Sequence, residues 1–399
     1  MAVLFLVVFV DLIGFGLLIP LLPFYVQRTG ADAELITLVL GLYSLGQFFA
    51  APLWGRLSDT YGRKPILVIT SLGLAISYLM LGYADSLPLL VASRVFGGLM
   101  AGNIGAAQAY VADITTPATR AKGMGLLGAA FGLGFIFGPA LGGLLSGRDL
   151  AHANFFLPAI AAATITIVAT IGAQIALKES LTPSARAGLT TRPRLPLRQR
   201  LKATFARAAL IMLVATGFIT VTGWAQFETV FALWANRILN YGPEDIGFIL
   251  TFIGIVTVII QGGAIGPLTR RFGERHLVVT ALVLLAIGYM LMAHAAALPE
   301  MLVACAVLAA GFGLFSPSLP SLVSQEAEDH ERGVILGTYQ GLTSLSRAIG
   351  PAFSGLVFER LGTSAPFLVG VGLALPALLL MILLPRRQPI GHEAPNPLK

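Results

Sequence analysis

Apolar segments of about 20 residues follow one another along almost the whole chain, and an α-helix needs this length to cross a bilayer. Hydrophobic residues make up 56% of the 399 residues and charged residues only 11%, whereas soluble domains contain about 25% charged residues. The composition therefore predicts an all-α membrane protein. Twelve transmembrane helices are expected at residues 2–26, 34–56, 66–84, 88–112, 121–147, 152–177, 208–236, 244–267, 276–296, 299–325, 333–360 and 363–385.

An internal repeat divides these helices into two halves. The charged stretch 55–65 (GRLSDTYGRKP) returns 211 positions later as 266–276 (GPLTRRFGERH), and GPALGGLL from Gly138 returns 212 positions later as GPAFSGLV from Gly350. A weak repeat at a constant offset predicts two pseudo-symmetric six-helix bundles around a central cavity, lined mainly by spans 1, 4, 7 and 10. The expected boundaries are 1–177 for the N-terminal bundle, 178–207 for a basic cytoplasmic linker, 208–385 for the C-terminal bundle and 386–399 for a cytoplasmic tail.

The distribution of basic residues predicts the orientation. Of the 26 Lys and Arg residues, 20 fall in one alternate set of loops and tails, four in the other set and two inside predicted spans. By the positive-inside rule the first set is cytoplasmic, so both termini are cytoplasmic. We expect a multi-pass protein of the cell (inner) membrane, surrounded by lipids. This topology accounts for the net charge of +7, so no nucleic-acid partner is expected.

Four ionisable residues lie inside predicted spans, where a charge costs about 2.5 to 3.5 kcal/mol on insertion scales. Asp11 lies about 15 Å along the first span, near mid-membrane, where desolvation favours the protonated carboxyl. Asp11, Glu228 and Arg94 are the candidates for proton coupling. Arg347, deep in the eleventh span, is a candidate partner of Glu228. The alternative for each is a structural ion pair or a hydrogen bond between helices.

Polar and aromatic side chains in the spans are candidates for substrate binding. Trp224 and Phe231 lie four residues before and three residues after Glu228, and this spacing predicts a helix face suited to an amphipathic guest, including a cation. Gln47 and Gln261 occupy matching places in the two halves. A polar side chain in a membrane can also simply bond an adjacent helix. The candidate substrate-binding set is Gln47, Asn103, Trp224, Phe231, Gln261 and Arg347.

Glycines recur every four residues in the fifth span. Gly134, Gly138 and Gly142 form a smooth stripe against which another backbone can pack closely, and Pro139 adds a kink. The alternative is ordinary small-residue packing. The matching places in the eleventh span hold Ser346, Gly350, Pro351, Ser354 and Gly355. We therefore expect the second half to pack less closely there.

The charged stretch 55–65 contains an acid, Asp59, among the bases Arg56, Arg63 and Lys64. A cytoplasmic loop needs only cations for its topology, so the acid requires a further explanation. A solvated loop charge is the plain alternative.

These motifs, and their order along the chain, resemble the signatures of the major facilitator superfamily, in its twelve-span drug/proton antiporter group. The chain is similar to the tetracycline efflux proteins of that group. GRLSDTYGRKP resembles the signature loop between spans two and three. Asp11 in DLIGFGLLIPLLP resembles the acid of span one, and Arg94 in SRVFGGLMAG resembles the arginine of span four. The fifth-span antiporter signature is present as Gly134, Gly138, Pro139, Gly142 and Gly143. The family also has glutamines at the places of Gln47 and Gln261.

The resemblance implies two devices for changing conformation. In the family the loop acid, here Asp59, pairs with an arginine after span four, here Arg120, and faces the positive end of a second-half helix, here the one starting near Gly333. The implied latch comprises Gly55, Asp59, Gly62, Arg63, Lys64 and Arg120. The fifth-span glycines imply a tight seam between the halves. The chain departs from the tetracycline proteins at Ser77 and Leu285, which replace acids, so tetracycline is not the expected substrate.

These observations predict proton-coupled efflux of a small amphipathic molecule by alternating access. The alternatives are a proton-coupled uptake symporter and, from another class, a membrane receptor or lipid-handling protein. Scattered histidines do not form a metal site, and neither a phosphate-binding loop ending in Gly-Lys-Ser/Thr nor a nucleophile–base spacing is present, so the chain is not expected to be an enzyme. Protons are the coupling ion, no cofactor is expected, and one chain is expected to function as a monomer.

Overall fold

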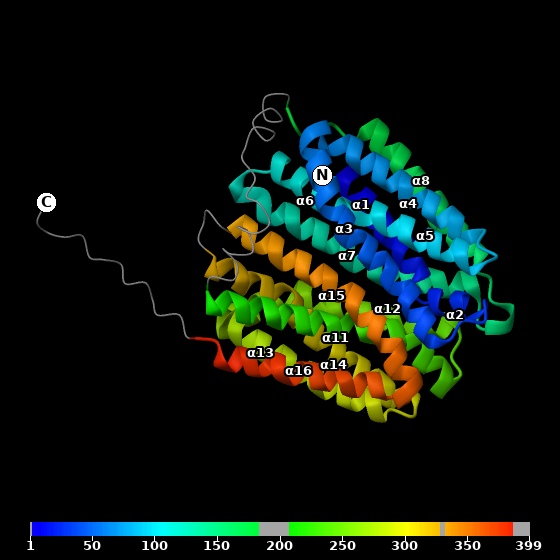
Figure 1. The fold of residues 1–399 in the computed structure, drawn as a ribbon. Helices are drawn as coiled ribbons and strands as arrows, with labels where there is room; N and C mark the ends of the chain where they lie inside the picture. Colours follow the sequence, from blue (N-terminus) through cyan, green and yellow to red (C-terminus); the bar gives the residue numbers. More distant parts are fainter. Residues whose placement is uncertain (1, 183–206, 328–331, 386–399) are drawn as a thin grey trace, which may run out of the picture.

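The structure is a computed structural model that describes residues 2–182, 207–327 and 332–385 (Figure 1). The described residues form helices and loops without a strand. The first half comprises α1 (Ala2–Leu18), α2 (Leu22–Gln27), α3 (Ala33–Tyr61), α4 (Arg63–Gly82), α5 (Leu87–Met100), η1 (Ala101–Asn103), α6 (Ile104–Ile114), α7 (Pro117–Ser146), η2 (Leu150–His152) and α8 (Phe156–Ala176). The second half comprises α11 (Ala208–Leu239), α12 (Pro243–Ile259), η3 (Ile260–Ala264), α13 (Ile265–His294), α14 (Leu298–Glu326), α15 (Arg332–Leu361) and α16 (Ala365–Leu383).

Nine helical segments of the described residues are long and apolar enough to cross a membrane. The longest, Pro243–His294, contains two of the predicted spans. These two spans are separated at Gly273, where the chain leaves helical geometry (φ 77°, ψ 157°). The first span appears as the shorter apolar helix α1, and the eleventh corresponds to α15. The prediction of an all-α fold with twelve helices in two six-helix halves is confirmed.

The same glycine break recurs in both halves. Gly62 (φ 110°, ψ 159°) separates α3 from α4, and Gly273 lies 211 positions later in the second copy of the charged stretch. Positive φ of this kind is readily adopted by glycine, which has no Cβ. The repeat seen in the sequence therefore marks the same sharp turn between consecutive helices in each half.

Two helix pairs join the halves. The helices of the first half, from α1 in blue to α8 in green in Figure 1, lie alongside those of the second half, from α11 in bright green to α16 in red. α7 packs extensively on α12, and α3 packs on α15. We call the end of the bundle that holds Gly62 and Gly273 the latch end, and the opposite end, where α7 finishes and α12 begins, the seam end.

Three predicted spans are interrupted within their length. Pro20 lies between α1 and α2, the turn η1 separates α5 from α6, and η3 is a π-helical turn between α12 and α13. The sequence predicted these spans as unbroken. The turn η1 is a 3-10 turn, whereas η3 is a π turn, a feature frequent at functional sites. Both η1 and η3 contribute residues to the cavity described below.

The predicted linker and tail lie largely outside the described residues. Residues 183–206 of the linker and the tail 386–399 are not described. The described start of the linker, residues 178–182, contacts the latch end of the first half.

Candidate functional site

A cavity of about 420 Å³ lies between the two halves. Its wall is built from α1, α3, α4, η1, α6 and α7 of the first half and from α11, α12, η3, α14 and α15 of the second, more helices than the four predicted. The predicted site residues that line it are Asp11, Gln47, Asn103, Pro139, Trp224, Glu228, Gln261 and Arg347. The structure thus brings together residues that are far apart in sequence.

Two of the residues predicted for proton coupling or substrate binding do not line this cavity. Phe231 is fully buried and packs against Phe227 and Trp234, so its expected place beside the substrate was wrong. Arg94 is 1% exposed, and its guanidinium carbon lies 5.8 Å from the ring centre of Tyr43, which does line the cavity. Its Nε and Nη2 atoms have no hydrogen-bond partner. Arg94 can therefore act on the cavity only through its neighbours.

Asp11 is held by two donors from other helices. Its Oδ2 atom accepts hydrogen bonds from Ser71 Oγ at 2.9 Å and from Asn103 Nδ2 at 3.3 Å. Its Oδ1 atom is buried without a partner. The carboxyl therefore has one oxygen that is stabilised when ionised and another that can carry a proton. Sequence reasoning missed Ser71, because nothing in the sequence links one serine of the third span to an acid of the first.

Glu228 lies in the second-half wall of the cavity. Its Oε1 atom accepts a hydrogen bond from Trp224 Nε1 at 2.8 Å. The Trp224 ring stacks on Phe312 of α14, with 4.0 Å between ring centres and an interplanar angle of 6°. The expected ion pair with Arg347 is not formed, since none of the ion pairs among the described residues joins these two side chains. The two opposite charges nevertheless share one cavity.

Much of the remaining wall is aromatic or polar. Gln47 donates to the carbonyl of Ala101 at 3.0 Å, so this side chain also fixes η1 against α3. Aromatic side chains occur on both sides of the cavity, whereas the sequence analysis singled out only Trp224 and Phe231 among the aromatic residues. The aromatic residues of the wall are Phe15, Tyr43, Phe131, Phe135, Trp224, Phe227 and Phe312.

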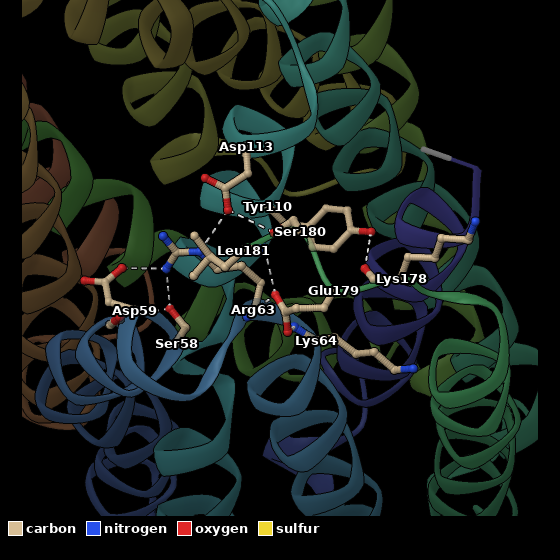
Figure 2. Close-up of polar contacts among 11 residues, drawn as sticks. Ser58, Asp59, Arg63, Lys64, Tyr110, Asp113, Lys178, Glu179, Ser180 and Leu181 are labelled. Carbon is tan, nitrogen blue, oxygen red and sulfur yellow. Dashed lines mark hydrogen bonds and ion pairs between the residues drawn. The ribbon is translucent and has the colours of Figure 1, made fainter. Parts of the chain in front are cut away.

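Polar residues of the latch end, among them Asp59 and Lys64 of the predicted latch, cluster around Arg63, as Figure 2 shows. The Arg63 guanidinium contacts Asp59 at 2.6 Å, Ser58 at 2.7 Å and Asp113 of α6 at 3.2 Å. Arg63 is only 5% exposed. The side chain of Arg120 lies outside the described residues, so its pairing with Asp59 stays a prediction. The ion pairs described here fasten α3, α4 and α6 to one another at the latch end.

The first residues of the predicted linker belong to this cluster (Figure 2). The Glu179 carboxylate accepts hydrogen bonds from the backbone nitrogens of Arg63 at 2.9 Å and Lys64 at 3.2 Å, at the start of α4. Ser180 donates to Asp113 at 2.9 Å, and Tyr110 donates to the carbonyl of Lys178 at 2.7 Å. A carboxylate at a helix N-terminus stabilises the unpaired N–H groups there. Residues 178–181, the start of the predicted basic linker, are thus held on the first half.

Basic residues at matching positions connect the third and sixth membrane spans of each half, which are α4 and α8 in the first half and α13 and α16 in the second. Lys64 Nζ donates to the carbonyl of Gln174 at 2.7 Å, near the end of α8. Arg275, 211 positions later, donates to the carbonyls of Ile382 at 3.2 Å and Leu384 at 2.6 Å, at the end of α16. Cations are stabilising at a helix C-terminus. Both copies of the charged stretch therefore perform the same structural task.

The glycine stripe of α7 faces its own half. A Cβ built on Gly134 would lie 2.6 Å from Leu12 Cβ, and one on Gly142 would overlap the Leu17 carbonyl, so the stripe packs on α1. The expected seam between halves is instead made by Gly143, whose Cβ would lie 2.9 Å from Glu244 Cα in α12. In the loop after α7, the Arg148 Nε atom lies 3.9 Å from the Glu244 carboxylate and 3.7 Å from the Asp245 carboxylate.

The glycines of α15, which correspond to those of α7, pack as closely on neighbouring helices as the α7 glycines do. A Cβ on Gly350 would lie 2.6 Å from the Thr222 carbonyl of α11, and one on Gly355 would overlap the backbone and side chains of α3 at Ala33 and Thr37. The expectation of looser packing in the second half was therefore wrong. The loss of two glycines to Ser346 and Ser354 is accommodated, because Ser346 donates to the Phe218 carbonyl at 2.9 Å.

Comparison with known proteins identifies the family. The sequence profile of the Major Facilitator Superfamily matches residues 4–265 and 218–399. The chain is 31% identical over 382 residues to Multidrug resistance protein 2 of Bacillus subtilis, covering 92% of each. It is 32% identical over 387 residues to the class C tetracycline resistance protein of Escherichia coli, covering 94% of this chain and 93% of the relative. The crystal structure of the human organic anion transporter MFSD10 (TETRAN) superposes with a TM-score of 0.73 at 26% identity, covering 95% of this chain and 98% of that one. The chain is therefore a multi-pass, non-enzymatic transport protein that belongs to the Major Facilitator Superfamily.

Proposed function

We propose that this protein exports small amphipathic molecules across the cell membrane in exchange for protons, by alternating access to the cavity between its halves. The observation that carries the proposal is one cavity that combines two membrane-embedded acids, Asp11 and Glu228, with a largely aromatic wall. An acid inside the membrane is a functional candidate by default, and an apolar pocket with few polar groups suits an amphipathic ligand. Relatives named for multidrug and tetracycline resistance favour export over uptake.

The conformation of the protein supports alternating access, in which the cavity opens to one side of the membrane at a time. The positive-inside rule assigns the latch end to the cytoplasm, with both termini. At the seam end the halves meet through backbone contacts of Gly143 and Gly247. Further towards the latch end, Gly128 lines the cavity and has open space beside it. This arrangement supports a state closed towards the outside, with the cavity accessible from the cytoplasm.

Asp11 is the proton carrier in this proposal. Ser71 and Asn103 support its ionised form, while the unpartnered Oδ1 atom offers a place for the proton. Arg94 would influence coupling through the ring of Tyr43. The polar residues Gln47, Asn103 and Gln261 are the proposed substrate contacts.

The proposal does not extend to tetracycline itself. Where the resembling tetracycline proteins carry acids, this chain has Ser77, whose hydroxyl donates to the Ser93 carbonyl at 2.8 Å, and the fully buried Leu285. Neither lines the cavity. We also propose that the protein functions as a monomer, with the cavity enclosed between the two halves of one chain.

Transport in proteoliposomes with an imposed pH gradient tests the proposal. A substrate is first chosen from compounds to which expressing cells become resistant, and whose export a protonophore stops. Asp11→Asn, which mimics the protonated carboxyl, should abolish uphill export and retain substrate binding and exchange without a gradient. Asp149→Asn, an exposed acid at the seam end, is the matched control. If Asp11→Asn still pumps uphill and Glu228→Gln does not, the assignment is reversed; if both pump, neither acid carries the coupled proton.

A further inference from the structure

One charged residue of the cavity wall is not used by proton exchange. Arg347 of α15 lines the cavity and is exposed there. Among the described residues it forms neither an ion pair nor a hydrogen bond with a protein group. A guanidinium stays ionised at any physiological pH. An arginine at membrane depth costs several kcal/mol in insertion and is a functional candidate for that reason.

Glu228, an acid in the same wall of the cavity, forms no ion pair with Arg347. Glu228 lies within electrostatic reach of Arg347 but accepts its hydrogen bond from Trp224. The guanidinium therefore faces the cavity with its donors available. Its planar array of N–H groups matches a carboxylate, to which it can donate two parallel hydrogen bonds.

The cavity that Arg347 lines also suits an aromatic ring system. Trp224 and Phe312, which both line the cavity, are stacked on one another, and this stacking holds both rings in place. Phe227 lies beside Trp224, with 5.4 Å between ring centres. Aromatic ligands pack favourably on such rings in offset or edge-to-face geometry. The second-half wall thus combines one free cation with a flat aromatic surface.

We propose that Arg347 binds the carboxylate of an aromatic substrate and that the cavity selects aromatic anions over cations of the same shape. This inference rests on the proposed export function and names its substrate class. It also gives Glu228 a distinct task. An ionised Glu228 repels an incoming anion and competes for Arg347, so it limits how tightly the anion binds.

Three probes of equal size and different charge test the proposal: 2-naphthoate, 2-naphthalenemethanol and 2-naphthylmethylammonium. Their dissociation constants are measured by equilibrium dialysis against the purified full-length protein, with detergent alone as the blank. We expect 2-naphthoate to bind at least about tenfold more tightly than the alcohol, which is typical of a hydrogen bond to a charged group. The ammonium probe should bind more weakly than the alcohol.

Variants separate recognition from a structural effect. Arg347→Gln should weaken 2-naphthoate binding about tenfold and leave the alcohol within about twofold, and Arg347→Lys should retain part of the preference. Glu228→Gln should tighten 2-naphthoate binding, in the opposite direction. Arg271→Gln, which removes an equal charge from an exposed site outside the cavity, is the control and should change nothing.

The proposal is overturned if the ammonium probe binds as tightly as 2-naphthoate, or if Arg347→Gln keeps the anion preference. Unchanged binding of the alcohol shows that a variant is folded. Export of cationic or neutral compounds, without preference for the anionic probe, would reject the anion site and keep the export function. An anion preference that depends on Arg347, in a protein that exports nothing, would do the reverse.

Discussion

Gly138 of α7 and Gly16 of α1 are in backbone contact, since a Cβ built on Gly138 would lie 2.6 Å from the Cα atom of Gly16. Any larger side chain must push the two helices apart, and overpacking of this kind costs about 1 to 3 kcal/mol. We expect Gly138→Leu to lower the melting temperature by several degrees and to slow transport. Gly125→Leu, in the same helix with open space around it, is the control. Equal behaviour of the two variants would show that the contact does not matter.

The contact between Arg148 and the start of α12 predicts a closure at the seam end. With Cys305, the only cysteine, replaced by alanine, Arg148→Cys and Glu244→Cys should be joined by a short bis-methanethiosulfonate reagent, because their native side chains lie 3.9 Å apart. Joining them should stop transport by holding the outside shut, and a reductant should restore it. Each single cysteine variant is the control. Normal transport by the joined protein would mean that the seam end need not open.

The Arg63–Asp59 ion pair predicts a coupled effect at the latch. Asp59→Asn should slow transport and leave the protein folded, since it removes one charged contact worth about 1 to 3 kcal/mol. Arg63→Gln should have a larger effect, because Asp113 also loses its partner. The double variant should be no worse than Arg63→Gln alone, as expected for residues that act as a pair. Strictly additive effects would rule out the pair. The same comparison of single and double variants, with Arg120→Ala in place of Arg63→Gln, tests the predicted Asp59–Arg120 contact.

Glu179 predicts that the start of the linker supports the latch. Glu179→Gln removes the charge that stabilises the backbone nitrogens of Arg63 and Lys64, so we expect slower transport and a melting temperature lower by a few degrees. Glu300→Gln is the matched control, because Glu300 likewise accepts a backbone hydrogen bond, from Ala296 at 2.7 Å, away from the latch. If both variants behave alike, Glu179 has only a local structural effect.

The sequence predicted the fold because a bilayer restricts it strongly. A chain inside hydrocarbon must satisfy its backbone groups within helices, so length and apolarity alone placed the spans. The same constraint located Asp11, Glu228 and Arg347, since charges at depth stand out by their cost. The breaks at η1 and η3 were not predicted, because neither interrupts the apolar pattern.

The sequence did not predict which neighbouring helix, or which part of the cavity, a given helix face contacts. Phe231 shares a helix with Glu228, but spacing along one helix cannot say which face meets the cavity and which meets Trp234. The stripe of Gly134, Gly138 and Gly142 was visible, yet its neighbour, α1 rather than the other half, was not. In a membrane helix both the core face and the lipid face are apolar, so the pattern that marks a core in a soluble protein is absent.

Two acids and one arginine in the cavity have an electrical consequence. With Asp11 and Glu228 ionised and Arg347 charged, the formal charges of the wall sum to −1, and one bound proton brings the sum to zero. Membrane potential does work only on net charge that moves, about 2.3 kcal/mol per elementary charge per 100 mV for a full crossing. In the proposed cycle, the carrier with one proton would therefore turn over without electrical work, and voltage would act on the step in which the unprotonated carrier moves.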